Sequence, residues 1–510
     1  FLSLARACFA PFRTAMAGFS VVAFLLGASL CFSQFQSTQG FERLRSFTVY
    51  SERLLLRPGE VHNAFVKPVP LPEYIVKQFA NKTMHLQKVD LDIVRVDGSS
   101  GKEEPLPLTA VYNHHHAMLV GTQHALEGIF NRSRGHDPLG PNQRLTGRRG
   151  HPDHGSAEAR ALRPRGCMMH GAAVNEFLAD VAEFAKGGKV AAFGGASGAE
   201  FRGTSTALPA PYTSASSSPE SFMGLLHFIN MRGAKAGDEG GVRSKRFECP
   251  CTSARKIDPA NGTVDGQKVL PFECSLELLQ QGNTGCSLST YIGGYRCCEH
   301  GVFLSEDIPG PEVLPDELRV KYTFTYYDEE LVGARPVRKP SCCDATGNET
   351  HKGNIEYDVP RCPEGSPPEF CEHVTMSVQP FDLPMNRSRN GSAIDPDEVL
   401  ELVHAWGHQH VGALGMELFH VRTGQLLCRT RPQYGNGSGA GDESGFVVGI
   451  PPCVWGPPPL SPPPRIRRGD LLRTMARYNS SEARHGVMSL WLMDAAPLAK
   501  TNGAKPDVLV

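Results

Sequence analysis

The sequence lacks most of the motifs that would assign a known chemistry directly. It contains no G-x-S-x-G elbow, no nucleotide-binding glycine pattern, no zinc-protease helix motif and no EF-hand loop. Its net charge of −1 gives no indication of nucleic acid or of an acidic surface as a partner. Beyond the first 32 residues, no apolar run is long enough to cross a bilayer. We therefore expect no nucleic-acid partner, and membrane contact only through the N-terminal segment.

The composition favours a large protein rich in β-structure. A chain of 510 residues is too long for one compact core, so two or more domains are expected. The 53 glycines and 40 prolines favour turns and loops over long helices. Segments that alternate apolar and polar residues, such as 46–61, 84–98 and 320–330, predict strands. The predicted fold class is mainly β, with two β-sandwich, jelly-roll-like domains.

The N-terminal segment is typical of a secretion signal. Arg6 and Arg13 precede an apolar run from Ala15 to Phe32, and polar residues follow it. This pattern predicts a signal peptide and a secreted, extracellular (apoplastic) protein. The run is close to membrane-spanning length, so the alternative is an uncleaved anchor that holds the protein to a membrane. The sequence begins with Phe1, and Met16 offers an alternative start.

Sequons and cysteines agree with export. Most of the 15 cysteines lie between Cys249 and Cys371, and in an exported protein they indicate disulfides. Their number stays odd when Cys8 and Cys31 leave with a cleaved signal, so we expect at least one thiol that is free or bonded to another chain. N-x-S/T sequons, which predict glycosylation, occur in turn-like segments at Asn81, Asn131, Asn261, Asn348, Asn386, Asn390, Asn436 and Asn479.

These patterns suggest an order of domains along the chain. The predicted layout is a signal peptide or anchor at 1–33, a first β-sandwich domain at 34–233, a cysteine-rich connecting segment at 234–371 and a second β-sandwich domain at 372–510. Within the first domain, a stretch at about 131–218 is rich in glycine, proline and small polar residues, and we predict that it is a flexible insertion.

The most informative stretch is GHQHVGALGMELF, which spans Gly407 to Phe419. His408 and His410 lie two residues apart in a predicted strand, so their side chains point to the same face. Two neighbouring imidazoles can share a metal ion, because neutral ring nitrogens are common metal ligands. An isolated pair also arises by chance in a chain with 19 histidines.

Three further features could contribute ligands, and each has a structural alternative. His114, His115 and His116 are consecutive; on a regular strand the first and third share a face, and a β-bulge could turn neighbours toward one ion. A solvated polar run is the alternative. His227, in the apolar strand LLHFI, would otherwise be a hydrogen-bonded core residue. Met488 would otherwise be packing, although a thioether favours copper over zinc, magnesium or calcium.

Several segments together resemble the stress up-regulated Nod 19 family of plants and related organisms. They are RCCEHGVFL, VKYTFTYYDEE, GHQHVGALGMELF, GFVVGIPPC and HGVMSLWLM. The resemblance is strongest from Tyr291 to Asp494 and extends to Ser46–Val120 and Phe222–Gly233. The Gly/Ser-rich insertions of the first half are not part of it.

The order of the histidine and methionine motifs also resembles the ascorbate-dependent type II copper monooxygenases. That resemblance implies two β-sandwich domains, each with one copper, across a solvent-filled cleft. It implies an electron-relay copper site of His114, His115 and His227, and an oxygen-activating copper site of His408, His410 and Met488. His116 departs from the pattern, because it makes the first cluster a triplet.

We interpret the chain as a secreted, glycosylated, disulfide-bonded stress-related protein with two copper sites. Its activity would be ascorbate-dependent monooxygenation of an unassigned small-molecule or extracellular substrate. The alternative is a non-catalytic extracellular stress or binding protein that retains the sandwich scaffold.

Overall fold

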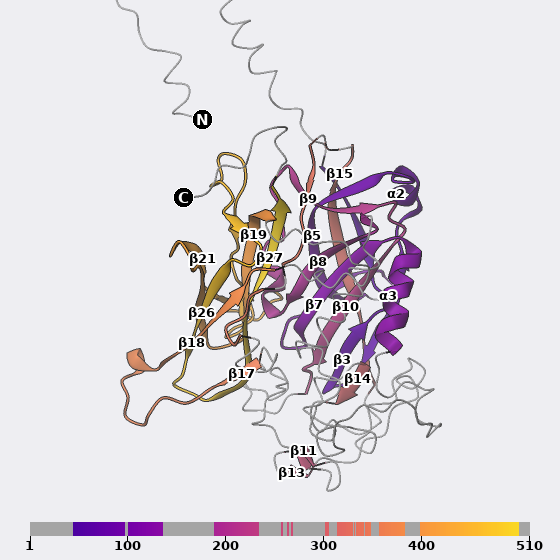
Figure 1. Ribbon diagram of the computed structural model, residues 1–510. Helices are drawn as coiled ribbons and strands as arrows, with labels where there is room; N and C mark the ends of the chain where they lie inside the picture. The colour runs from indigo at the N-terminus through magenta and orange to yellow at the C-terminus, as the bar shows by residue number, and fades with distance from the viewer. Residues whose placement is uncertain are drawn as a thin grey trace, which may run out of the picture. The chain divides into compact units, whose positions relative to one another are not determined.

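The computed structural model describes residues 44–96, 100–135, 188–233, 257–258, 263–264, 267–268, 301–304, 314–329, 331, 333–340, 342–347, 356–382 and 398–498 (Figure 1). All of them belong to one compact unit, Leu44–Val510. The expected signal segment 1–33 lies outside the described residues. The prediction of a mainly β fold with antiparallel sheets is confirmed.

The first sandwich consists of two facing sheets that enclose one apolar core. One sheet has the strand order β1 (Leu44–Tyr50), β15 (Asp316–Tyr327), β5 (Thr83–Val96), β9 (Tyr212–Ser217) and β16 (Arg335–Pro336), with β2 (Leu54–Leu56) on β15 and β6 (Glu103–Pro105) on β5. The other has the order β14 (Gly301–Leu304), β3 (Glu60–Phe65), β10 (Ser221–Asn230), β7 (Val111–Gly121) and β8 (Val190–Ser197), with β4 (Val69–Pro70) on β10. Two helices accompany this sandwich, α2 (Glu73–Gln78) and α3 (Gln123–Gly135).

Strand β15 shows how the sequence pattern produces this core. Its alternate residues Leu318, Val320, Tyr322 and Phe324 are fully buried, because side chains of period two face the opposite sheet. The ring of Phe222 on β10 meets the rings of Tyr322 and Phe324 edge-on, with centroids 5.5 and 6.2 Å away. Burial of each such aromatic side chain stabilises the fold by roughly 1.5–3 kcal/mol.

The second sandwich is built the same way from the C-terminal part of the chain. One sheet has the order β17 (Glu356–Val359), β27 (Arg484–Pro497), β19 (Val399–Gln409) and β24 (Cys453–Val454), with β25 (Arg465–Arg467) on β19. The facing sheet has the order β18 (Glu372–Pro380), β26 (Leu471–Asn479), β20 (Ala413–His420) and β21 (Leu426–Thr430). A separate core cluster fills the space between them. The smaller elements are β11 (Ile257–Asp258), β12 (Thr263–Val264), β13 (Gln267–Lys268), β22 (Gln433–Tyr434), β23 (Val447–Gly449) and the 3₁₀ turns η2 (Ala199–Arg202) and η6 (Pro368–Phe370).

The structure differs from the predicted layout in two places. Strand β15 lies within the range expected to connect the sandwiches, yet it is an inner strand of the first one, paired with β1 and β5. The prediction of a flexible insertion is wrong for residues 188–218, which form β8, η2 and β9. Strand β8 pairs with β7, and β9 pairs with β5. The small residues of this segment, which are typical of linkers, are here part of packed strands.

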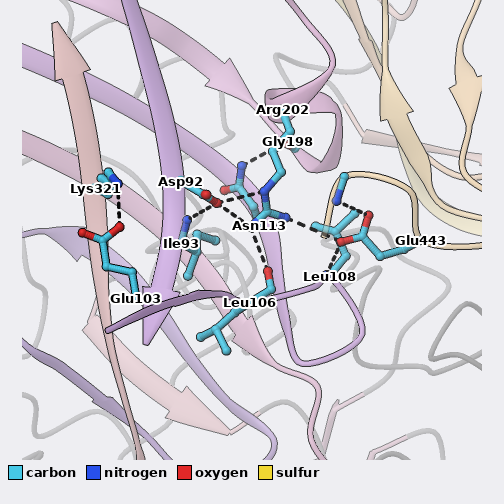
Figure 2. Close-up of polar contacts among 11 residues, drawn as sticks. Asp92, Ile93, Glu103, Leu106, Leu108, Asn113, Gly198, Arg202, Lys321 and Glu443 are labelled. Carbon is cyan, nitrogen blue, oxygen red and sulfur yellow. Dashed lines mark hydrogen bonds and ion pairs between the residues drawn. The ribbon is translucent and has the colours of Figure 1, made fainter. Parts of the chain in front are cut away.

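Polar side chains join the two sandwiches along their shared interface. Arg335 donates hydrogen bonds to Glu401 at 2.5 Å and to the hydroxyl of Tyr212 at 3.1 Å. The fully buried carboxylate of Glu443 accepts the Leu108 N–H at 2.8 Å, as Figure 2 shows. Such buried polar groups are costly unless paired, so these contacts hold the two halves in one arrangement.

The described cysteines and sequons fit the expected chemistry of an exported protein. The six cysteines among the described residues form the disulfides Cys342–Cys343, Cys362–Cys371 and Cys428–Cys453. Asn81, Asn131, Asn436 and Asn479 are exposed, whereas the sequons at 261, 348, 386 and 390 lie outside the described residues. In the part of the chain that the structure describes, no helix has the length and apolar character needed to span a bilayer.

Candidate metal centre

A β-bulge brings the upstream histidines together. On β10, His227 pairs with His115 of β7, but the next residue, Phe228, pairs with Asn113. His114 is therefore an extra residue in β7, and the bulge lets two consecutive side chains reach the same site. The ring centroid of His114 lies 4.4 Å from that of His115 and 4.3 Å from that of His227. His116 is turned elsewhere, and its Nδ1 lies 3.1 Å from the side-chain nitrogen of Asn113.

A second β-bulge places His408 and His410 at the interface between the sandwiches. On β19, Leu402 pairs with Ala495 and His404 pairs with Asp494, so Val403 is an extra residue. After this bulge, His404, Trp406 and His408 share one face by strand alternation, and His410 comes directly after the end of the strand. The opposite face carries Ala405, which belongs to the core of the second sandwich. The rings of His408 and His410 lie 5.1 Å apart.

The two groups of histidines meet in a single cluster. Potential ligand atoms of His114, His115 and His227 lie within 4.8 Å of one another, and so do those of His115, His408 and His410. His115 belongs to both groups, and its ring centroid is 4.7 Å from that of His408. Nitrogens bound to one ion at about 2 Å each lie no more than about 4 Å apart, so small side-chain rotations would close either group around an ion. All five side chains are buried, at 1–6% exposure.

This arrangement differs from the one implied by the copper monooxygenases. There, two sites face each other across a solvent-filled cleft, whereas here the two groups share His115 and contact each other directly. The ring of His114 from the first sandwich lies 5.3 Å from that of His410 from the second. The described residues therefore form one contiguous centre between the sandwiches.

The backbone of Met488 lies beside this cluster. Strand β27 pairs Leu490 with His408 and Ser489 with Gln409, so alternation puts Met488 on the same sheet face as His408. Val487, its neighbour, belongs to the core on the other face. The hydroxyl of Tyr478 accepts the His410 N–H at 2.8 Å and donates to the Met488 carbonyl at 2.7 Å. Met488 is fully buried. Its assignment as a ligand stays a prediction.

The electrostatics of the cluster favour neutral imidazoles. Burial lowers the pKa of His114 well below its ordinary value, and the neighbouring histidines lower it further. Burial, followed by the proximity of His62 and His410, lowers the pKa of His227 to about 3. Both rings are therefore neutral near pH 7, which is the form that binds metals. Several ring nitrogens of the cluster have no hydrogen-bond partner: both nitrogens of His114, Nε2 of His227 and Nε2 of His408. Buried nitrogens without partners are costly, and a metal ion would remove that cost.

Glu200 contacts the cluster, and the sequence analysis did not predict it. It is fully buried in η2, and its Oε1 lies 3.0 Å from Nδ1 of His408. Burial alone would raise the pKa of Glu200, but its contact with His408 and its hydrogen bonds with backbone N–H groups lower it. Glu200 escaped notice because it lies in the stretch that composition marked as a flexible insertion.

Other buried histidines of the described residues lie outside both groups, among them His404 and His62. The Nε2 of His404 lies 3.1 Å from the carbonyl oxygen of Ser205. Burial lowers the pKa of His404 to about 4, although Asp494 opposes this. His62, on β3, also has its pKa lowered to about 4 by burial. Neither is among the ligand groups, so burial of a histidine in this fold does not by itself indicate a metal ligand.

Fold and site together define a class: a mainly β protein of two sandwiches with a buried, histidine-rich candidate metal centre between them. The family model for stress up-regulated Nod 19 matches residues 188–497, more than half of the chain. The protein therefore belongs to the stress up-regulated Nod 19 family, as its motifs predicted. His227, His408, His410 and Glu200 lie within the matched region. Comparison with curated proteins finds no match.

Proposed function

We propose that the histidine cluster is a copper centre and that the protein is an exported, ascorbate-dependent monooxygenase. The observation that carries this proposal is the convergence of five buried histidines from both sandwiches, in two groups that share His115. The resemblance to the type II copper monooxygenases suggests the reaction class, and the close approach of the five histidines supports them as ligands.

The donor set supports copper or zinc over magnesium and calcium. Imidazole nitrogens suit copper and zinc, whereas magnesium and calcium prefer carboxylate and carbonyl oxygens. Neither ligand group contains a carboxylate, since Glu200 contacts the cluster through the ring of His408. A thioether at Met488 would add preference for copper, because soft sulfur ligands favour Cu(I). In this assignment His114, His115 and His227 hold one ion, and His408, His410 and Met488 hold the other.

Bound copper would supply one-electron redox chemistry and activation of dioxygen. The overall reaction would convert a substrate C–H bond and dioxygen into an alcohol and water, with two electrons from ascorbate and two protons. The protein's own part is to hold neutral imidazoles in place and to keep bulk water away from them, which the burial of all five rings supports. No substrate class follows from the described residues.

Export is part of the same proposal. The disulfides Cys362–Cys371 and Cys428–Cys453 join segments of the second sandwich and favour an oxidising compartment. The exposure of the four described sequons is compatible with glycosylation during secretion.

The test is metal analysis and oxygen uptake on the full chain expressed in a secretory host. Loaded with Cu(II) and freed of excess, the protein should retain two coppers per chain and consume oxygen when ascorbate and substrate candidates are added. The double variant H408A/H410A should lose at least one copper and the uptake. H404A is the matched control, because His404 is a buried histidine on the same strand outside both groups.

The outcomes separate the two interpretations of the chain. Copper that is retained without oxygen uptake favours a non-catalytic binding protein, and a preference for zinc over copper points the same way. Failure to bind either metal contradicts the metal centre itself.

A further inference from the structure

We propose that Glu200 is a positioning residue that fixes the ring of His408 so that its Nε2 is presented to the metal. The inference rests on the proposed function for the existence of a bound metal, and it adds a role for a residue outside the ligand set. Its evidence is the geometry around His408.

The contact is charge-assisted and shielded from water. The Oε1 of Glu200 lies 3.0 Å from Nδ1 of His408 and also accepts the Gly198 N–H at 2.9 Å. The side chains of Glu200 and His408 are 0% and 2% exposed. A carboxylate only accepts hydrogen bonds, so Nδ1 must carry the proton in this contact. The lone pair of the ring is then on Nε2, the nitrogen that has no hydrogen-bond partner.

Gly198 gives the ring of His408 the space that this orientation needs. A Cβ atom added at Gly198 would lie 2.5 Å from Cε1 of His408 and 2.7 Å from the carbonyl oxygen of His114. Contacts under 3 Å do not occur for real Cβ atoms, so any side chain here would displace the ring or the strand. The carbonyl oxygen of Gly198 accepts a hydrogen bond from the side chain of Asn113 at 2.8 Å, which fixes this position (Figure 2).

The pair also spans the two sandwiches. Glu200 follows β8 of the first sandwich, and His408 belongs to β19 of the second. No strand pairing joins these two elements. The contact between Glu200 and His408 would therefore help to hold a ligand of the second sandwich against the ligands of the first. Hydrogen bonds from carboxylates to metal-ligating histidines fix the tautomer, and their loss typically costs 10–100-fold in metal affinity.

The experiment compares E200Q with E443Q. Glu443 is the matched control, because it is equally buried at the interface and accepts the Leu108 N–H, but it belongs to no ligand group. Copper affinity is measured by competition with a chelator, and the Cu(II) site by electron paramagnetic resonance. Stability is followed by urea unfolding. The tautomer of His408 in metal-free protein is read from ¹⁵N NMR of histidine-labelled samples.

We expect E200Q to lower copper affinity about 10–100-fold and to change the Cu(II) spectrum, with E443Q leaving both unchanged. G198A retains the carboxylate but displaces the ring of His408, so it should also lower copper affinity. It replaces E200Q in the experiment if E200Q does not fold. In metal-free wild type, the proton of His408 should reside on Nδ1, because the carboxylate of Glu200 can only accept a hydrogen bond.

Two negative results are distinguishable. If wild type binds copper but E200Q and G198A bind it equally well with unchanged spectra, the role of Glu200 is refuted while the metal centre stands. If wild type binds no metal, the proposed function fails, and the NMR experiment still decides whether Glu200 sets the tautomer of His408. A proton on Nε2 rather than Nδ1 of His408 in metal-free wild type would refute the positioning role in either case.

Discussion

The buried histidines should make the metal-free protein sensitive to mild acid, and His404 allows this to be measured at one position. Burial lowers its pKa to about 4 in the folded state, with Asp494 opposing and Lys339 reinforcing the shift. In the unfolded chain its pKa is about 6.5. Because the unfolded state takes up the proton first, this contribution to stability is full above pH 6.5 and is lost as the pH falls toward 4.

The size of the effect follows from the shift. A difference of about 2.5 pKa units corresponds to about 3.4 kcal/mol over the whole window, of which about 2 kcal/mol is lost between pH 7 and pH 5. His62, whose pKa is also lowered to about 4, should contribute a similar amount. Two such losses are a large part of the 5–15 kcal/mol by which domains are usually stable.

The assay is urea unfolding of metal-free wild type and H404Q at pH 7, 6 and 5. H404Q should be less stable than wild type at pH 7, because it loses the contact with Ser205, but it should lose about 2 kcal/mol less on going to pH 5. Equal losses in the two proteins, with unchanged denaturant slopes, would refute the conclusion that His404 is buried in its neutral form.

Three further predictions concern the scaffold. F324A should destabilise the protein by about 3–5 kcal/mol, measured by urea unfolding, because Phe324 is fully buried in the first core; an effect below about 1 kcal/mol would contradict that packing. C428A/C453A should cost about 2–4 kcal/mol, because the disulfide closes a loop with a sequence separation of 25, and addition of a reductant should abolish the difference from wild type. R335A should cost about 2–3 kcal/mol, because it removes the nearest cation of the largely buried Glu401, which keeps only the Tyr212 hydroxyl and the more distant Arg465. R335A/E401Q should recover part of this loss, and no recovery would contradict the direct coupling of the pair.

The sequence predicted the parts of the molecule that follow from local patterns. Alternation of apolar residues identified β15 as a strand, since that pattern is the direct result of one face being buried. It also placed His408 and His410 on one face. The possibility of a bulge in the triplet was foreseen, and the pairing of His227 with His115 locates the bulge at His114.

What the sequence could not provide were relations between distant segments. No local pattern shows that β15 pairs with β1 and β5, because a partner some 270 positions away depends on the packing of the whole sheet. The merging of two histidine groups through His115 depends on how the sandwiches dock. Glu200 was missed for a related reason: an acidic residue among small residues is usually solvated, and only the fold brings it to His408.

The shared histidine cluster has a consequence for how the protein matures. Its five histidines come from segments as far apart as His114 and His410, so neither half of the chain can assemble the whole cluster before the other has folded and docked. Ions encountered during synthesis would meet at most a pair or trio of imidazoles, and full occupancy would come last. Full metal occupancy would thus occur only in molecules whose two sandwiches have folded and docked. Loss of the ion would be an early event when the sandwiches separate.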